Sequence, residues 1–445
     1  MIVNTAAAMP DHLGVVNEAI VRAVCGTDPV IVVDSPPGAG KTFLVENAAV
    51  FAAAERGMRV GVVTPGVPQA YDVVDRMLAY DLPRLELVHA ESRSLPQYLS
   101  GRIVASQGWN PNLNQGPGVL VANVHIPAAH IERLPPASFD LLIVDEAYQL
   151  ASSQFLQVAD LAERVLLVGD PGQLPPVISA DTANLEAAKH KMHWPAPRYV
   201  LDRWPMTPVY GLPATRRLLP DTARLVQSAF YPELPFESIA MPADRRLVFD
   251  VAGVDPAIDP ALDAVAAGAS LVAIVLPGAP PAHEDADGEV SAMIARVAQR
   301  LLVRRARWAG RHLTGADIGC IDSNRIPVGS IAGHLRAAGM PEVSVDTVER
   351  WQGLQRPFTV VRHPLSRVGE PQAFDLEAGR WCVALSRHLL GCLIVCRESV
   401  AQVVDEYRHT CDTAAAGARD SVWAGYTAHR AIWSELGRQG RLFRV

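Results

Sequence analysis

A chain of 445 residues corresponds to two or three domains, because a domain averages about 150 residues. Hydrophobic residues make up 49% of the chain and charged residues 20%, which is enough apolar material for packed cores and too little charge for a disordered protein. The net charge of -7 argues against a protein that coats nucleic acid through bulk positive charge, so any strand must be bound in a local groove.

The longest uncharged apolar run and the N-terminus both bear on cellular location. The run from Ala264 to Leu276 has 13 residues, whereas a membrane-spanning helix needs about 20. The first residues, MIVNTAAAMPDHLG, lack the basic region and long apolar core of a secretion signal. We therefore expect a cytoplasmic protein with no membrane partner.

The six cysteines include no CxxC pair. Cys392 and Cys396 lie in the apolar run LLGCLIVC and share one face of a predicted strand, which favours buried core thiols over metal ligands. No zinc module is predicted.

Short β-branched runs alternate with longer helical patterns, which is typical of βαβ units and a parallel sheet. The runs show no apolar–polar alternation, as expected where helices cover both faces of a sheet. The first series of predicted strands comprises residues 29–34, 59–65, 118–124, 141–146 and 164–170. The second series comprises residues 271–277, 317–322, 343–348, 358–364 and 389–396. The predicted fold class is therefore α/β, with two doubly wound parallel-sheet lobes.

A proline-rich stretch separates the two series of strands. Residues 192–213 contain five prolines and little periodicity, so they mark the junction between a first lobe at 1–200 and a second lobe at 201–400. Residues 401–445 are predicted to form a helical appendage whose aromatic residues dock on the second lobe.

The sequence SPPGAGKT follows the first predicted strand and opens a helix. In the pattern GxxxxGK[ST], backbone N–H groups surround phosphates, the lysine reaches the β- and γ-phosphates, and the final hydroxyl holds Mg²⁺. Lys41 and Thr42 occupy those positions, whereas Ser35 replaces the first glycine, and a chance turn is the alternative. The predicted nucleotide-binding loop consists of Ser35, Pro36, Pro37, Gly38, Ala39, Gly40, Lys41 and Thr42.

The stretch FDLLIVDEAYQL is an apolar strand that ends in two carboxylates. Asp145 is predicted to hold Mg²⁺ and Glu146 to orient and deprotonate the attacking water. Two acids that cap the next helix are the alternative, but a phosphate loop in the same chain favours the catalytic interpretation.

The stretch RVLLVGDPGQLPPV adds a further strand and a rigid turn. Gln173 both donates and accepts hydrogen bonds, so it can contact a γ-phosphate in one state and a neighbouring lobe in another. In this order and spacing, GKT, DEAYQ and GDPGQLPP resemble the first-lobe motifs of superfamily 1 helicases, specifically the DEAxQ branch that includes the nonsense-mediated-decay RNA helicase and its DNA helicase relatives. The resemblance implies tandem RecA-like lobes with the ATP site in the cleft between them.

The second lobe carries stretches that resemble further motifs of this family. LPATRRLLPDTARLVQSAFYPEL is similar to the family stretch that contains QYRMHP, and RWCVALSRHLLGCLIVC is similar to RxNVAxTRA. The resemblance assigns Arg217 and Arg387 as arginine fingers on the γ-phosphate and Arg380 as a structural arginine. VSVDTVERWQGLQRPF resembles TVDxFQGxE, which gives Gly353 and Gln355 the nucleotide contacts of that motif.

Several residues depart from the family pattern. Gln355 stands where the family has Glu, Cys382 where it has Asn, His388 where it has Ala, and Pro327 where Gln is common. The family often has an adenine-reading Gln upstream of the phosphate loop, and Asn17 is the nearest match, with a plain helix-surface Asn as the alternative.

Contacts to a nucleic acid strand are less visible in the sequence. The resemblance places hydroxyls and backbone amides that fix a strand without reading its bases at Thr64, Pro65, Gly66, Ser323 and Thr347. The predicted helix 291–311 bears a stripe of arginines that we interpret as a solvated face. Trp109 is interpreted as a packing residue, with stacking on a base as the alternative.

These observations predict an ATP-driven, Mg²⁺-dependent translocase or helicase on single-stranded nucleic acid, with DNA slightly favoured over RNA. A nucleic-acid-gated ATP switch within a larger nucleic-acid-processing complex is the first rival, because only 78 residues lie between VVTPG and DEAYQ, too few for a large inserted domain. A small-molecule kinase is the second rival, and it leaves GDPGQLPP and the distant arginines unused.

Overall fold

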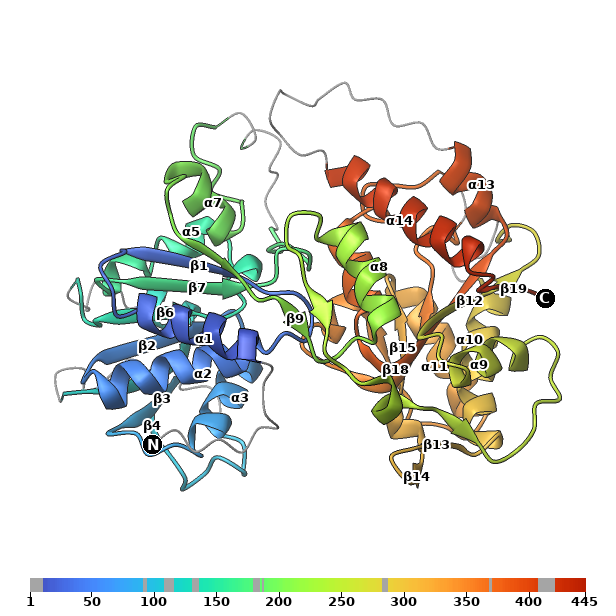
Figure 1. Cartoon of the computed structure of the whole chain (residues 1–445), viewed down its shortest axis with the longest axis horizontal. Helices are drawn as coiled ribbons and strands as arrows, with labels where there is room; N and C mark the ends of the chain where they lie inside the picture. Colours follow the sequence, from blue (N-terminus) through green and yellow to red (C-terminus); the bar gives the residue numbers. More distant parts are fainter. Residues whose placement is uncertain are drawn as a thin grey trace. The chain divides into compact units, whose positions relative to one another are not determined.

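The computed structural model describes residues 11–90, 94–107, 116–129, 136–178, 185, 188–281, 287–367, 370–406 and 421–445 (Figure 1). The chain divides into two compact units. The first comprises Met1–Pro171 and Pro175–Pro213, and the second comprises Gly172–Leu174 and Ala214–Val445. Each unit is built around its own parallel sheet, and we describe the two separately.

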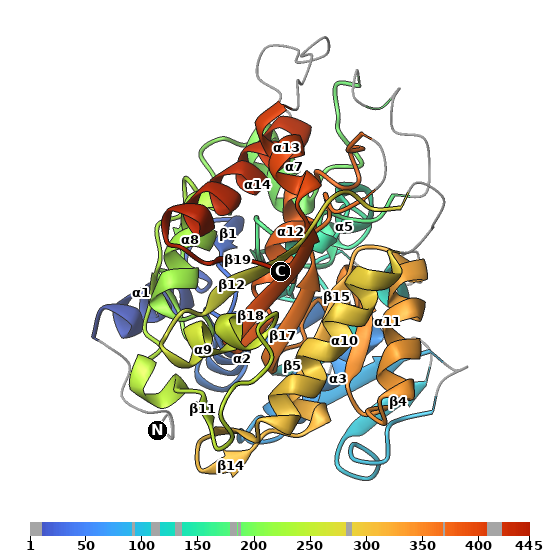
Figure 2. The ribbon, with the colours of Figure 1, turned by 90° about the vertical axis from the view of Figure 1, so that its right-hand side faces the viewer.

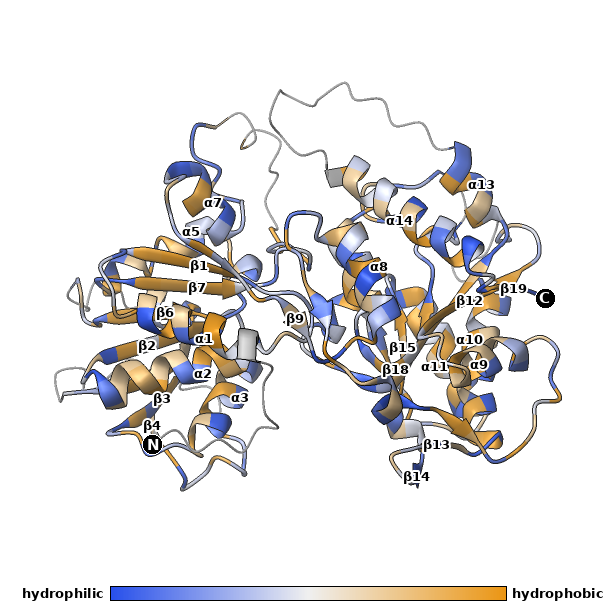
Figure 3. Cartoon of the chain, in the orientation of Figure 1, coloured by the Kyte–Doolittle hydropathy of each residue, from blue (hydrophilic) through white to orange (hydrophobic). Residues whose placement is uncertain are grey.

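The first unit contains an eight-stranded parallel sheet in the order β4-β3-β5-β2-β6-β7-β1-β8. Its strands are β1 Val30–Asp34, β2 Arg59–Thr64, β3 Leu85–His89, β4 Val104–Gln107, β5 Gly118–Asn123, β6 Leu141–Val144, β7 Val165–Gly169 and β8 Val209–Gly211. The strands are among the most apolar parts of the unit (Figure 3). The sheet order puts the phosphate loop, which follows β1, beside the ends of β6 and β7.

Helices cover both faces of this sheet. They are α1 Asp11–Ala23, α2 Lys41–Val50, α3 Val67–Met77, α4 His125–Ala129, α5 Ser152–Phe155 and α7 Ala196–Arg203, with shorter helical turns η1 Phe51–Glu55, η3 Ala147–Gln149 and η4 Ala159–Leu161. Val60 and Val62 of β2 pack with α1, α2 and α3, whereas Val63 packs in a separate cluster with α4, α5 and α7. The alternating side chains of one strand are thus buried on opposite faces.

The second unit contains a six-stranded parallel sheet in the order β16-β15-β17-β18-β12-β19. Its strands are β12 Leu271–Leu276, β15 Ile318–Asp322, β16 Ser344–Thr347, β17 Arg356–Arg362, β18 His388–Arg397 and β19 Leu442–Arg444. Smaller sheets pair β9 Ala214–Thr215 with β10 Glu237–Ser238, and join β11 Val248–Phe249, β13 Ala306–Trp308 and β14 Arg311–His312.

Both faces of the second sheet are also covered, as a view turned by 90° shows (Figure 2). The helices are α8 Pro220–Phe230, α9 Asp259–Ala266, α10 Gly288–Val303, α11 Arg325–Ala337, α12 Ala378–Leu385, α13 Ser399–Glu406 and α14 Ser421–Arg438, with turns η5 Pro242–Arg245, η6 Gly315–Asp317 and η7 Val348–Trp351. One core cluster joins α9, α10 and α11 to Val272 and Ile274 of β12, and another joins α12 and α14 to Leu271 and Ala273 of the same strand.

The predicted α/β fold with two parallel-sheet lobes is confirmed. Cys392 and Cys396 are fully buried in β18, as expected. The sequence reading missed β3, β4, β8 and β19. Among the residues that the structure describes, no helix is both long and apolar enough to span a membrane.

The C-terminal stretch 401–445 is part of the second unit. Within it, α14 packs against α12 and α8, and Tyr426 is 3% exposed. The expectation of a purely helical appendage was incomplete, because β19 pairs with β12 at the edge of the sheet. Its short sequence, LFR, offers too little periodicity to predict a strand.

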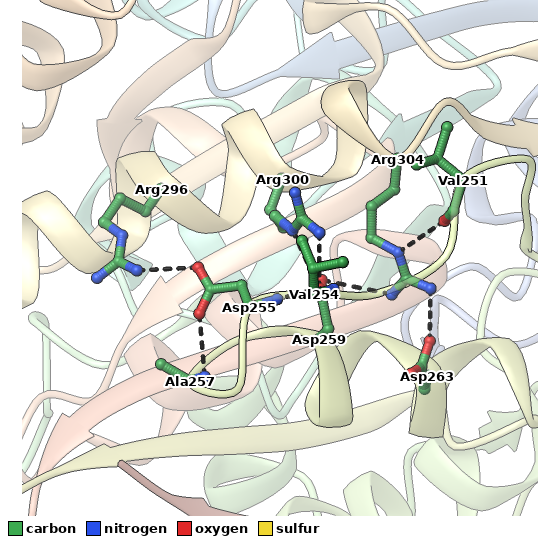
Figure 4. Close-up of polar contacts among 9 residues, drawn as sticks. All are labelled: Val251, Val254, Asp255, Ala257, Asp259, Asp263, Arg296, Arg300 and Arg304. Carbon is green, nitrogen blue, oxygen red and sulfur yellow. Dashed lines mark hydrogen bonds and ion pairs between the residues drawn. The ribbon is translucent and has the colours of Figure 1, made fainter.

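The interpretation of 291–311 as one solvated basic helix was wrong for the extent of the helix and for Arg300 and Arg304. The side chains of the other arginines in the stretch are 44–61% exposed, as expected. The helix α10 ends at Val303, and Arg304 is 4% exposed. Arg300 is bidentate with Asp259, whose Oδ2 lies 2.7 Å from Arg300 Nη2, and Arg304 Nη2 lies 2.7 Å from Asp263 Oδ1 (Figure 4). The arginines at this end of α10 therefore fasten it to α9.

Candidate nucleotide site and arginine cluster

The phosphate loop connects β1 to α2. Ser35 N–H donates to the Gly169 carbonyl at 2.9 Å, which fastens the start of the loop to the end of β7. Gly40 has φ 96° and ψ 36°, a left-handed conformation that glycine adopts without strain, and Lys41 follows as the first residue of α2. A ten-residue helix thus begins directly after the loop, which is the arrangement that anion binding by backbone N–H groups requires.

Lys41 lies between two carboxylates of the first unit. Its Nζ is 3.7 Å from Glu146 Oε1 and 3.6 Å from Asp170 Oδ2, and its side chain is 10% exposed. Acids at the ends of β6 and β7 thus hold this largely buried lysine. A bound phosphate can replace them as its partner. The structure therefore brings Lys41 and Glu146, both predicted site residues, together.

Asp145 and Glu146 end the strand β6 in different environments. Asp145 is 4% exposed, and its Oδ1 accepts the Glu146 N–H at 2.9 Å. Burial and the neighbouring Glu146 carboxylate raise the pKa of Asp145, whereas Lys41 lowers it. Glu146 adopts φ 51° and ψ 42° and accepts a hydrogen bond from Gln149 Nε2 at 3.3 Å. A non-glycine residue in the left-handed region is uncommon, and this backbone conformation ends the extended strand at Glu146.

Two further acids, Asp34 and Asp170, line this site. Neither was assigned a role from the sequence. Asp34 ends β1, and its Oδ1 accepts a hydrogen bond from Tyr148 Oη at 2.7 Å. Burial raises the pKa of Asp34 to about 6, and the Asp170 carboxylate adds to the rise. The signal in the sequence is the acidic residue at the end of each apolar strand, in VIVVD and in VLLVGD.

The donor set at the end of β6 suits a hard cation. Mg²⁺ takes oxygen ligands at near-octahedral geometry and is usually held by one or two carboxylates together with substrate phosphates. The Asp145 carboxylate is buried beside Glu146, and the Thr42 hydroxyl stands in the first turn of α2. These residues fit Mg²⁺, because the cation would relieve the crowding of negative charge that raises the Asp145 pKa.

The remaining predicted residues of the first unit lie on nearby elements. Asn17 is a partly exposed residue of α1. Thr64 ends β2 and donates its hydroxyl to the Gly66 carbonyl at 2.8 Å, so Thr64, Pro65 and Gly66 form one turn before α3. Trp109 lies outside the described residues.

Arg217 belongs to the second unit and donates hydrogen bonds to two acceptors there. Its Nε donates to Gln355 Oε1 at 3.0 Å and its Nη1 to the Ser386 carbonyl at 3.1 Å. Gly353, with φ 77°, lies in the turn that leads to Gln355. The structure thus brings Arg217 and Gln355, which are distant in the sequence, into direct contact.

Arg380 lies in the first turn of α12 and Arg387 in the connection from α12 to β18, and the two have different partners. Arg387 is 1% exposed and donates from Nε to the Val383 carbonyl at 3.1 Å and from Nη2 to Ser386 Oγ at 3.3 Å. Arg380 instead forms ion pairs with Glu349 and, at 2.9 Å, with Glu377. Arg380 therefore has carboxylate partners, as expected of a structural arginine.

Gln173 follows β7, but Gly172–Leu174 belong to the second unit. Gln173 is 8% exposed, and its carbonyl lies so close to Gly379 of α12 that a side chain at position 379 would collide with it. Leu174 joins the cluster around Trp351 and Trp381. This segment packs as a core element of the second unit.

Ser323 and Thr347 lie at the carboxyl ends of neighbouring strands. Asp322, the last residue of β15, pairs in register with Thr347 of β16, and Ser323 follows directly. Ser323 is 7% exposed and Thr347 is 9% exposed. Two of the predicted strand-binding residues therefore share one edge of the second sheet.

The departures from the family pattern lie in or near packed parts of the second unit. Cys382 is buried, with its Sγ 3.3 Å from Tyr231 Oη. His388 is fully buried, and burial lowers its pKa to about 4, so its imidazole is neutral at pH 7. Pro327 lies in the first turn of α11.

Comparisons with known proteins agree with this site at the level of the fold. A family model described as an AAA domain matches residues 17–193, which hold the phosphate loop, Asp145 and Glu146. The first unit thus has the fold of a phosphate-loop nucleoside triphosphatase. No curated protein matches the chain.

Three solved structures resemble the chain distantly. The complex of arterivirus nonstructural protein 10 (helicase) with DNA has 15% sequence identity and a TM-score of 0.44, over 84% of this chain and 62% of that one. The same helicase without DNA in its title has 15% identity and a TM-score of 0.41, over 84% and 61% of the two chains. The PRRSV helicase has 13% identity and a TM-score of 0.40, over 96% and 70%. The chain thus spans less than two thirds of the length of the first two.

Proposed function

We propose that this protein is an ATP-driven, Mg²⁺-dependent motor on single-stranded nucleic acid. The observation that carries the proposal is Lys41, at the head of α2, within 3.7 Å of Glu146 and 3.6 Å of Asp170. This arrangement joins a phosphate-binding cation to carboxylates at the ends of adjacent strands. A resting ion pair keeps the lysine in place until a phosphate replaces its partners.

Within the first unit, each residue has a distinct task in hydrolysis. Lys41 binds the β- and γ-phosphates, and Glu146 orients the attacking water and accepts its proton at the side-chain carboxylate. Thr42 and Asp145 are the residues that would hold Mg²⁺, which when bound neutralises charge on the phosphate oxygens.

The arginines of the second unit complete the site in this proposal. Arg217 and Arg387 approach the γ-phosphate when the two lobes close on ATP, and their guanidinium groups stabilise the charge that spreads over the transferred phosphoryl group. Support comes from the hydrogen bonds to Gln355, Val383 and Ser386, which orient the two guanidinium groups. ATP binding is thereby coupled to lobe closure.

The nucleic acid strand contacts both lobes in the proposal. Thr64 and Gly66 offer groups to the strand from the first lobe, and Ser323 and Thr347 from the second. A strand that bridges both lobes favours the closed state, so it accelerates hydrolysis.

A nucleic-acid-gated switch without intrinsic unwinding is a second candidate, and one observation favours it. Between α3 and β5, the described residues form β3 and β4, which are strands of the first sheet itself. This part of the chain therefore forms strands at one end of the first sheet, in the place where a strand-separating domain would have to be inserted. A motor would need a smaller element or a partner protein to separate a duplex.

Steady-state ATP hydrolysis with and without poly-dT and poly-U tests the proposal. We expect Mg²⁺-dependent hydrolysis that rises when a single strand is added. A fluorescent duplex with 5′ or 3′ single-stranded tails then separates the candidates, because the motor displaces the labelled strand and the switch does not. A rate unaffected by any strand would leave only a nucleic-acid-independent ATPase.

A further inference from the structure

Three short strands of the second unit form a small antiparallel sheet, and two of them, β13 and β14, lie at the lower end of this unit in Figure 1. The strand β13 is central, with Arg307 opposite Val248 of β11 on one side and opposite His312 of β14 on the other. The two residues that connect β13 to β14, Ala309 and Gly310, have positive φ of 50° and 79°. A two-residue turn of this kind matches the twist of the strands that it joins, so the hairpin is tight.

The two faces of this small sheet have different surroundings. Leu247 and Ala306 are buried in the core cluster that includes α9 and α10, and Phe249 and Trp308 pack against that cluster. Because successive residues of a strand lie on opposite faces, the residues between these four face solvent. They are Arg246, Val248 and Asp250 on the first strand, Arg305 and Arg307 on the second, and His312 on the third, and we refer to them as the basic face.

Three basic side chains of the basic face meet at one carboxylate. Arg307 Nε lies 2.8 Å from Asp250 Oδ1. His312 Nε2 and Arg305 Nε lie 2.8 Å and 3.8 Å from the other oxygen, Oδ2. The hydrogen bond to His312 and the charges of the arginines hold the pKa of Asp250 below its usual range. With Arg246, the face has three arginines and one aspartate, an excess of two positive charges on a chain of net charge -7.

Two neighbouring ion pairs are balanced one to one and provide a contrast. Arg311 is bidentate with Asp317, at 2.6 and 2.7 Å. Arg296 of α10 lies 2.9 Å from Asp255. On the basic face, by contrast, several cations share one acid, and the arginine side chains that meet it are 44% and 61% exposed. A phosphate group that approaches this face therefore meets excess positive charge on accessible guanidinium groups.

The basic face lies at the opposite end of β15 from a predicted strand-binding residue of the same unit. The hairpin residue Arg311 is paired with Asp317, which directly precedes β15, whereas Ser323 directly follows this strand. Five residues of extended strand span about 16 Å, which is longer than one nucleotide. A nucleic acid strand that is held at Ser323 can therefore reach the basic face only with nucleotides further along its backbone.

We propose that the basic face binds backbone phosphates of the nucleic acid strand, outside the segment that Ser323 and Thr347 hold. The planar guanidinium groups match the geometry of phosphate oxygens, and the imidazole of His312 adds another hydrogen-bonding group. The face selects no base, because phosphate contacts carry no sequence information. This inference rests on the proposed function and adds a second contact region for its strand.

Fluorescence anisotropy of the full chain with labelled oligo-dT of two lengths tests the basic face. A strand of about 6 nucleotides fits a single binding groove, and a strand of about 20 extends well beyond it. Arg307→Gln should weaken binding of the long strand at least about threefold and reduce its salt slope by about 0.7. Binding of the short strand should not change. An equal loss with both lengths, or no loss with either, would contradict the assignment.

The matched control is Arg296→Gln. It removes the same charge from a side chain of similar exposure, 50% against 44% for Arg307, that also pairs with an aspartate. It should bind both strands as the wild type does. A loss with the long strand as large as that of Arg307→Gln would show that any surface arginine has this effect, and it would overturn the specific role of the basic face.

Asp250→Asn tests the shared carboxylate in the opposite direction. The amide still accepts a hydrogen bond from Arg307 or His312, but it no longer offsets their positive charge. The long strand should therefore bind at least about threefold more tightly than it binds the wild type. Melting temperatures verify that both variants fold. Unchanged or weaker binding of the long strand by folded Asp250→Asn would overturn the inference.

The outcomes separate this inference from the proposed function. If strands bind and stimulate ATP hydrolysis while Arg307→Gln and Asp250→Asn change nothing, the basic face is overturned and the motor proposal stays in place. If the chain binds labelled polyglutamate and no strand, the partner of the face is an acidic protein, and the inference is wrong. Absence of binding to every strand overturns both proposals.

Discussion

The two units differ in the groups that contact their predicted site residues. In the first unit, Lys41 is surrounded by the carboxylates of Glu146 and Asp170, and Asp145 lies buried next to Glu146. In the second unit, Arg217 and Arg387 donate hydrogen bonds to carbonyl, amide and hydroxyl oxygens. An acid-rich site suits a phosphate that arrives with a divalent cation. The acids of the first unit and the arginines of the second thus have different tasks in the proposed function.

Within the second unit, Arg380 provides an internal contrast. It has the carboxylates of Glu349 and Glu377 as partners, whereas Arg217 has Gln355. The family pattern has Glu where this chain has Gln355. The amide of Gln355 therefore accepts a hydrogen bond from Arg217 without adding a negative charge beside it.

The largest expected effect is on Arg217. Arg217→Ala should lower kcat for ATP hydrolysis by about 10³-fold, because transition-state charge loses its guanidinium partner, with little change in nucleotide affinity. The measurement is steady-state hydrolysis together with binding of a fluorescent ATP analogue. Arg216→Ala, at the preceding position, is the matched control and should retain activity. Equal losses in both variants would remove the distinct role of Arg217.

Loss of the general base is expected to have the next largest effect. Glu146→Gln should retain ATP binding and lower kcat by at least about 100-fold, because the amide cannot accept the proton of the attacking water. Single-turnover hydrolysis measures the chemical step directly. Near-wild-type turnover in this variant would assign the proton transfer to another group.

A smaller effect is expected where Gln355 positions Arg217. Gln355→Ala removes the acceptor of Arg217 Nε, so the guanidinium loses orientation and kcat should fall about tenfold. Nucleotide affinity and the melting temperature should stay close to wild type. A loss of affinity with unchanged kcat would instead assign Gln355 to nucleotide binding, as in the family motif.

The arginines that fasten α10 to its neighbours test the contrast between functional and structural arginines. Arg304→Met leaves the buried Asp259 carboxylate with fewer partners and should lower the free energy of unfolding by about 3 kcal/mol. Arg296→Met removes a half-exposed pair with Asp255 and should cost less than about 1 kcal/mol. Urea denaturation measures both, and single-strand affinity should change in neither. Weaker strand binding in either variant would instead assign Arg296 and Arg304 a role in binding the nucleic acid strand.

The sequence predicted those parts of the molecule that rest on local patterns. The long apolar runs identified the central strands, and the order GKT, DEAYQ, GDPGQLPP placed Lys41 and Glu146 in one site, which the structure shows at 3.7 Å. Two strands escaped prediction because β3 carries the buried Glu86 and β19 is only three residues long. Their pairing depends on tertiary contacts that no local pattern reports.

Contacts between distant segments could not be predicted in the same way. The Tyr148 to Asp34 hydrogen bond joins the turn η3 to the end of β1, and Gly172–Leu174 packs in a unit other than that of the strand before it. The arginines of 291–311 have a helical spacing that fits a solvated face, yet their partners on α9 bury Arg304. Spacing alone does not distinguish solvent from an acidic partner helix.

Strand-stimulated ATP hydrolysis, compared between the wild type and Arg217→Ala, tests the central claim most directly. If a single strand acts by bringing the arginines of the second unit to the nucleotide, poly-dT or poly-U should accelerate the wild type and leave the variant near its basal rate. Equal stimulation of both proteins, or a wild-type rate indifferent to every strand, would contradict the account.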